Sequence, residues 1–150
     1  MNKNGFSLIE LLVAVAILGI LAAIGINSYT GYIDSARTKQ ATAGLSSIYL
    51  NQEEFRSSNR SYYPTAGANC TDDVDNTVEI NGDPNAGGGL FSGDQTLVRE
   101  NFVFCIEAAA NSNSYTAFAY SRRNGDWYSI TNNNVRASNI DGTQTISEGW

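Results

Sequence analysis

The chain has 150 residues, with 9 lysines and arginines against 15 aspartates and glutamates and no histidine, so its formal net charge is −6. This length predicts one domain with a modest core. The absence of histidine excludes histidine-dependent catalytic triads and histidine metal sites, and the acidic balance argues against a general phosphate-binding surface. We therefore expect neither an enzyme nor a cofactor.

An apolar run occupies residues 6–26, after the short polar leader MNKNG. It reads FSLIELLVAVAILGILAAIGI, and Glu10 is its only charged residue. As a helix it would rise about 30 Å, which is enough to cross a bilayer. Three interpretations are open. The run is a secretory signal cleaved near Ala22 and Ala23, a plain membrane anchor, or a helix in which Glu10 has a function, because charges inside membrane helices usually do.

The block Gly5-Phe6-Ser7-Leu8-Ile9-Glu10-Leu11-Leu12 resembles the prepilin motif of type IV pilins, of the type IVa-like kind. The similarity continues through ILGILAAIGINSYTGYIDSARTKQA and covers roughly the first third of the chain. The resemblance implies that residues 1–5 are a leader, that a prepilin peptidase cleaves between Gly5 and Phe6, and that the new amine of Phe6 is methylated. It also implies that Glu10 of an incoming subunit pairs with the Phe6 amine of a neighbour in a filament.

The helical pattern continues beyond the apolar run. Residues that recur mostly at spacings of three and four mark one face of an amphipathic helix. They are Tyr29, Tyr32, Ile33, Ala36, Ala41, Leu45, Ile48, Tyr49, Gln52 and Phe55. The sequence therefore predicts one helix over residues 6–57, about 78 Å long, of which residues 6–26 form the transmembrane segment or filament core. Because glycine weakens helices by about 1 kcal/mol relative to alanine, we expect the stretch from Gly19 to Asn27 to be its softest part.

Residues 58–150 are expected to form a globular head. A glycine-rich stretch without a sustained period predicts a long irregular connection over residues 58–96. Strand-like runs follow at residues 97–108, 114–121 and 126–131, with a last strand near residues 143–146. The dipeptide Asn124-Gly125 predicts a type I′ hairpin turn. The predicted fold class is α+β, with the long N-terminal helix packed against a C-terminal antiparallel sheet, which is also the fold that the resemblance to pilins implies.

The chain contains two cysteines, Cys70 and Cys105. In an exported domain an even number of cysteines predicts a disulfide. Two free buried thiols are the alternative.

The segment from Cys70 to Glu107 holds eight acidic residues and one arginine, a net charge of −7. A solvated loop face is the simpler interpretation, and it predicts no metal. The alternative is a calcium site that uses Asp73, Asp75 and Asp83, although neither acidic run completes the EF-hand pattern.

The resemblance implies a structural subunit of a type IV pilus. Such a chain is a precursor in the bacterial inner membrane and is then polymerised through its N-terminal helix into a surface filament for motility, adhesion, DNA uptake or aggregation. Its implied partners are the membrane, the prepilin peptidase, the pilus assembly machinery and other copies of itself. Two alternatives stay open: a pseudopilin of type II secretion, and a minor pilin whose head binds a ligand such as DNA. Arg122 and Arg123, flanked by Tyr120 and Trp127, are the expected ligand contacts.

Overall fold

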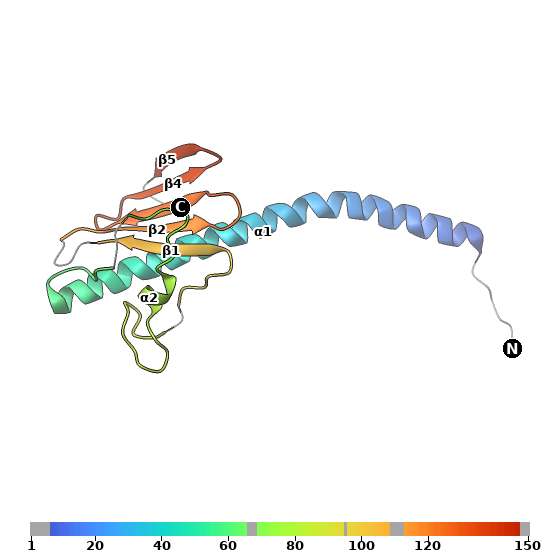
Figure 1. Cartoon of the computed structure of the whole chain (residues 1–150). Coiled ribbons are helices and arrows are strands. Elements are labelled where there is room, and N and C mark those ends of the chain that lie inside the picture. The colour runs from blue at the N-terminus through green and yellow to red at the C-terminus, as the bar shows by residue number, and fades with distance from the viewer. Residues whose placement is uncertain (1–6, 66–68, 95, 109–112, 148–150) are drawn as a thin grey trace. The chain divides into compact units, whose positions relative to one another are not determined.

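The computed structural model describes residues 7–65, 69–94, 96–108 and 113–147. Within these ranges two helices precede five strands. They are α1 (Leu8–Asn59), α2 (Thr77–Asn81), β1 (Phe102–Glu107), β2 (Thr116–Ser121), β3 (Trp127–Thr131), β4 (Arg136–Ile140) and β5 (Thr143–Ser147). The strands form one antiparallel sheet in the order β1-β2-β3-β4-β5 (Figure 1). The predicted α+β fold class is confirmed.

The chain divides into two compact units, Met1–Thr38 and Lys39–Trp150. The first unit contains the N-terminal part of α1. The second contains the rest of α1, together with α2 and the sheet.

The core of the second unit lies between α1 and the sheet. Ala41, Leu45 and Ile48 follow one another at helical spacing and have no exposed surface. They belong to one buried cluster with Phe104 and Ile106 of β1. The predicted amphipathic pattern thus identified the helix face that is buried here, because residues three and four apart share a face.

The segment that follows α1 is held against the helix by a buried side-chain amide. Gln52 is fully buried, and its side chain both accepts a hydrogen bond from the backbone N–H of Tyr63 at 2.8 Å and donates one to the Tyr63 carbonyl at 3.2 Å. Both polar ends of the amide are therefore satisfied, as a buried polar group requires. The helix ends at Asn59, two residues beyond the predicted end.

The hairpin turns differ from the prediction. The β2–β3 hairpin is present, but the prediction of a type I′ turn at Asn124-Gly125 is wrong. Such a turn needs a positive φ at both residues, and only Gly125 has one, of 73°. The loop spans residues 122–126. A pair of residues with positive φ is found instead between β4 and β5, at Asp141 (50°) and Gly142 (77°). An Asp-Gly pair of this kind suits a type I′ turn.

Candidate functional site

The N-terminal part of α1 exposes apolar side chains on every face. From Leu8 to Ile26 its large apolar residues are between 54% and 79% exposed. By length and composition α1 can cross a membrane. Because apolar surface in water costs about 25 cal/mol per Å², this part of the helix requires lipid or protein around it.

Glu10 lies in the first turn of α1. Its carboxylate Oε2 accepts a hydrogen bond from the backbone N–H of Ser7 at 2.9 Å. Ser7 directly precedes the helix, and a serine three residues before a glutamate is the spacing of a capping box. The negative charge is also favourable at this end of the helix dipole. Gly5 and Phe6, the predicted cleavage and methylation residues, lie outside the described residues.

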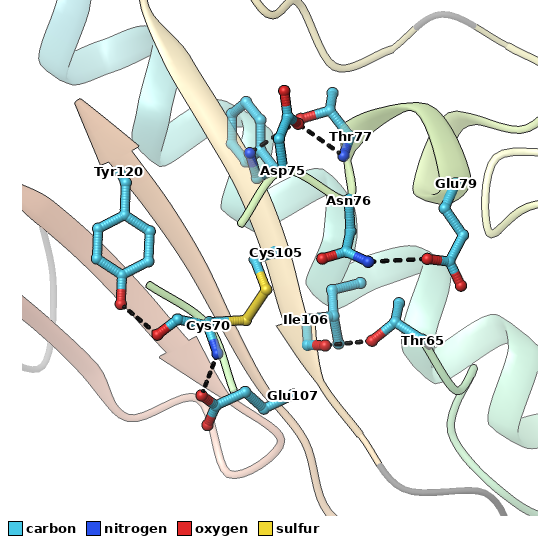
Figure 2. The surroundings of a disulfide bond; sticks show 11 residues. Thr65, Cys70, Asp75, Asn76, Thr77, Glu79, Cys105, Ile106, Glu107 and Tyr120 are labelled. Carbon is cyan, nitrogen blue, oxygen red and sulfur yellow. Dashed lines mark hydrogen bonds between the residues drawn. A yellow bond between two sulfur atoms is a disulfide. The ribbon is translucent and has the colours of Figure 1, made fainter. Parts of the chain in front are cut away.

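Cys70 and Cys105 form a disulfide, with their Cα atoms 5.8 Å apart, so this prediction is confirmed. Figure 2 shows how Cys70 is held beside the sheet. Its backbone N–H donates to the carboxylate of Glu107 at 2.8 Å, and its carbonyl accepts a hydrogen bond from the hydroxyl of Tyr120 at 3.0 Å. The disulfide and these two bonds attach the connection before α2 to both β1 and β2.

The same connection runs along the outer edge of β1, the first strand of the sheet. The backbone N–H of Asn76 donates to the carbonyl of Phe104 at 2.9 Å, and the N–H of Phe104 donates to Thr77 Oγ1 at 2.9 Å. The hydroxyl of Thr65 donates to the carbonyl of Ile106 (Figure 2). These bonds satisfy edge groups that would otherwise be open to another strand.

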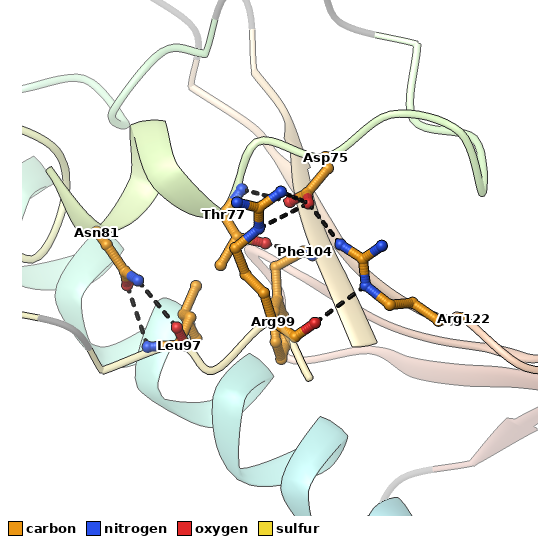
Figure 3. A network of polar contacts seen from close by, with 7 residues as sticks. All are labelled: Asp75, Thr77, Asn81, Leu97, Arg99, Phe104 and Arg122. Carbon is orange, nitrogen blue, oxygen red and sulfur yellow. Dashed lines mark hydrogen bonds and ion pairs between the residues drawn. The ribbon is translucent and has the colours of Figure 1, made fainter. Parts of the chain in front are cut away.

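Asp75 links three segments of the head (Figure 3). Its Oδ2 accepts hydrogen bonds from Nε and Nη2 of Arg99 at 2.9 and 2.6 Å and from Nη2 of Arg122 at 2.9 Å. Its Oδ1 accepts a bond from the backbone N–H of Thr77 at 3.0 Å. The side chain of Asp75 is 17% exposed. Burial raises its pKa, but the hydrogen bonds from Thr77 and the guanidinium of Arg99 outweigh burial, so the pKa lies below the ordinary aspartate value.

The predicted ligand contacts have different surroundings. Arg122 is engaged by Asp75 and also donates to the carbonyl of Arg99 at 3.0 Å. Arg123 is exposed in the β2–β3 loop. Their predicted aromatic neighbours, Tyr120 and Trp127, both pack on Phe118. Nε and Nη2 of Arg122 are therefore already engaged, by the Arg99 carbonyl and by Asp75.

The acidic residues considered for calcium are not gathered around a common point. In the described part of the chain, no three histidine, cysteine, aspartate or glutamate side chains are placed to hold a metal ion. The carboxylate of Asp75 binds two guanidinium groups instead. Asp83 Oδ1 accepts hydrogen bonds from the backbone N–H groups of Asn85 and Ala86 at 2.7 and 3.3 Å, which stabilises its own loop.

The N-terminal segment is shared with known proteins. Residues 1–26 match the prokaryotic N-terminal methylation motif. The chain is 40% identical over 61 residues to the type IV major pilin protein PilA of Myxococcus xanthus, which is 41% of this chain and 28% of that protein. The N-terminal segment of the chain is thus similar to that of type IV pilins. The chain is also 36% identical over 66 residues to a fimbrial protein of Neisseria meningitidis, 39% of each chain, and 43% identical over 58 residues to a fimbrial protein of Moraxella nonliquefaciens.

These similarities span 28 to 39% of the length of the three related proteins. Most of each relative therefore lies outside the match. The rest of this chain has to be understood from its own residues.

Sequence reasoning missed two features of this chain. The Ser7-x-x-Glu10 spacing is a recognisable capping signal, yet Glu10 was considered only as an assembly residue. The cluster of Asp75 with Arg99 and Arg122 was also missed, because these residues are far apart in the sequence. The isolated Arg99 in an acidic segment was the one available signal, since a lone arginine there is the natural counter-ion.

Proposed function

We propose that this chain is a pilin, a structural subunit of a type IV pilus, rather than an enzyme. Residues 1–5 are a leader, a prepilin peptidase cleaves between Gly5 and Phe6 and methylates the new amine of Phe6, and the mature chains polymerise through the N-terminal part of α1. The observation that carries this proposal is the methylation motif over residues 1–26, with Glu10 set in an exposed apolar helix.

The chemistry of Glu10 fits this role. After cleavage the amine of Phe6 and the carboxylate of Glu10 are four residues apart, which places them on one helix face. A single charge in lipid is costly, and opposite charges attract strongly at low dielectric. Pairing between neighbouring copies therefore stabilises both groups. It also sets the register, because a slip leaves both charges buried and unpaired at a cost of several kcal/mol, about 3 to 5.

The exposed apolar helix supports both stages of the proposed pathway. In the inner membrane, lipid covers the segment from Leu8 to Ile26. In the surface filament, the same segments of neighbouring copies cover one another, which removes apolar surface from water in the same way. The required partners are the prepilin peptidase, the pilus assembly machinery and further copies of the chain.

The direct test is the N-terminus of the protein in filaments sheared from cells. Intact mass and N-terminal sequencing should give an abundant chain that begins with N-methylated Phe6. Cells that lack the prepilin peptidase are the control, and there the chain should keep residues 1–5 and stay out of the sheared fraction. Cleavage near Ala23, or a processed chain that is absent from sheared filaments, would contradict the proposal.

A further inference from the structure

The triplet Asn-Gly-Asp occurs at residues 81–83 and again at residues 124–126. An asparagine that precedes a glycine can lose its side-chain amide without an enzyme, because glycine has no Cβ to shield its backbone nitrogen. The two triplets offer the same local chemistry. Any difference in their reactivity is therefore set by the fold around them.

The first triplet is locked in the packed part of the second unit. Asn81 is only 2% exposed. Its Oδ1 accepts a hydrogen bond from the N–H of Leu97 at 3.0 Å, and its Nδ2 donates to the Leu97 carbonyl at 2.9 Å (Figure 3). The N–H of Gly82 donates to the carbonyl of Val78 at 2.9 Å. The amide of Asn81 therefore cannot turn onto the Gly82 nitrogen unless this packing opens.

The second triplet lies in the β2–β3 loop, where Asn124 and Gly125 are both exposed. The N–H of Gly125 donates to the carbonyl of Ser121 at 3.3 Å, which is longer than the usual range of about 2.7 to 3.2 Å. The side-chain Nδ2 of Asn124 donates to Oδ2 of Asp126. This contact joins the residues on either side of Gly125, so it turns the amide of Asn124 toward the segment that holds the Gly125 nitrogen.

We propose that Asn124 is a site of spontaneous deamidation, where the folded chain converts itself to aspartate and isoaspartate. The backbone nitrogen of Gly125 loses its proton and attacks Cγ of Asn124, a step that is fast because both groups belong to one chain. The bond between this nitrogen and Cγ forms while the bond between Cγ and Nδ2 breaks. Nδ2 takes up the proton and leaves as ammonia, and a cyclic succinimide remains.

Water then opens the succinimide of Asn124. If the bond from the Gly125 nitrogen to Cγ breaks, the product is aspartate. If the bond from that nitrogen to the backbone carbonyl carbon breaks, the product is isoaspartate, and the main chain continues through the former side chain. Nothing is oxidised or reduced, and water, the one co-reactant, reaches this exposed loop.

Either product changes the contacts of Asp126. A carboxylate replaces the amide that donated to Asp126 Oδ2, and two like charges at this separation repel each other. The other oxygen of Asp126, Oδ1, accepts a hydrogen bond from the N–H of Asp141 in the β4–β5 turn at 2.9 Å. Deamidation therefore weakens the link between the two loops, and it changes the net charge of the chain from −6 to −7. The reaction uses only this chain and water, so it is independent of the proposed function.

The test compares the two triplets within one sample. The full chain in detergent is incubated at mildly alkaline pH, which favours loss of the Gly125 proton, and is then digested at acidic pH to stop the reaction. Peptide mapping by mass spectrometry measures the replacement of each amide by a carboxyl group. Product should accumulate at Asn124 at least about tenfold faster than at Asn81, because Asn81 reacts only after local opening.

Two controls separate the fold from the local sequence. In urea with the Cys70–Cys105 disulfide reduced, Asn81 and Asn124 should react at similar rates, because their neighbours in the triplet are the same. Asn124→Gln keeps the amide donor but has one more methylene, which disfavours ring closure, so position 124 should keep its amide in the folded chain. Equal rates at Asn81 and Asn124 in the folded chain, or a tenfold difference that persists in urea, would overturn the proposal.

Discussion

Asp75 receives a forked pair of hydrogen bonds from Arg99, whose Nε and Nη2 lie 2.9 and 2.6 Å from one carboxylate oxygen. Arg99 lies just before β1, and Asp75 lies in the connection that covers the edge of that strand. Hydrogen bonds between charged groups are roughly twice as strong as neutral ones. The pair therefore fixes the connection at one end, as the Cys70–Cys105 disulfide fixes it at the other.

Replacing Asp75 by asparagine should destabilise the head by about 1 to 3 kcal/mol, because two guanidinium groups lose their charged acceptor. Half of the Arg99 side chain is exposed, so water compensates part of the loss. The measurement is urea denaturation of the full chain in detergent. Asp73→Asn, an exposed neighbour, is the matched control and should change little. Equal stability of the two variants would contradict this role for Asp75.

The same carboxylate predicts a pH dependence. The folded-state pKa of Asp75 lies below its ordinary value of 3.8, so its contribution is fully present above the unfolded pKa and is lost as pH falls through the folded pKa. The difference in unfolding free energy between wild type and Asp75→Asn should therefore shrink as pH is lowered below about 4. A difference that stays constant down to pH values below the folded pKa would contradict the prediction.

Gly44→Ala should destabilise the second unit, residues 39–150, by about 1 to 3 kcal/mol, because the added methyl group overlaps the buried ring of Phe104. The better helix propensity of alanine, about 1 kcal/mol, offsets only part of this cost. Gly31→Ala is a sharp control, since nothing lies within 4 Å of a Cβ at that position of the same helix. Thermal unfolding of both variants in detergent should show a lower midpoint for Gly44→Ala alone.

Local patterns predicted the elements whose own residues specify them. The face that carries Ala41, Leu45 and Ile48 was identified because helix periodicity is a short-range signal. Strand β4 (Arg136–Ile140) was not predicted. The Asp141-Gly142 pair that follows it is a strong turn signal, but the sequence of the strand itself, RASNI, has no alternation of apolar and polar residues. The strand is specified by pairing with β3 and β5 rather than by its own composition.

The polar contacts of the head could not be predicted for a related reason. Asp75 meets Arg122 across 47 residues of sequence, and only the folded sheet places the β2–β3 loop beside the connection. The disulfide was predictable because the chain has a single pair of cysteines. Among the 15 acidic residues and seven arginines of the chain, no comparable restriction selects one pairing.

Tyr115→Phe should leave stability unchanged or raise it by up to about 1 kcal/mol. The hydroxyl of Tyr115 is buried and has no hydrogen-bond partner among the described residues, and an unsatisfied buried polar group is unfavourable. Burial also raises the pKa of Tyr115 well above its ordinary value, so the hydroxyl stays neutral. The measurement is urea denaturation at neutral pH.

Tyr62→Phe is the matched control for this prediction. The ring of Tyr62 packs against that of Tyr115 at 4.8 Å between centroids, but its hydroxyl donates to Glu53 and accepts from Arg56, both at 2.9 Å. Removing that hydroxyl should cost about 1 to 2 kcal/mol. Similar losses in the two variants would show that the hydroxyl of Tyr115 has a partner after all.

Glu10→Gln and Glu10→Ala separate the two roles that Glu10 combines. Glutamine can still accept the hydrogen bond from the N–H of Ser7, because a capping box accepts glutamate or glutamine, but it cannot form an ion pair with an amine. Alanine loses both interactions. Both variants should insert in the membrane normally, since each removes a charge from an apolar helix, while the yield of sheared filaments falls by about tenfold or more.

The measurement compares the amount of chain in sheared filaments with the amount in membranes. Amide exchange at Ser7 in detergent should be slower in the glutamine variant than in the alanine variant, because only glutamine retains the cap. If Glu10→Gln assembled at the wild-type level, the charge would be unnecessary, and the capping hydrogen bond to Ser7 would be the function of this residue.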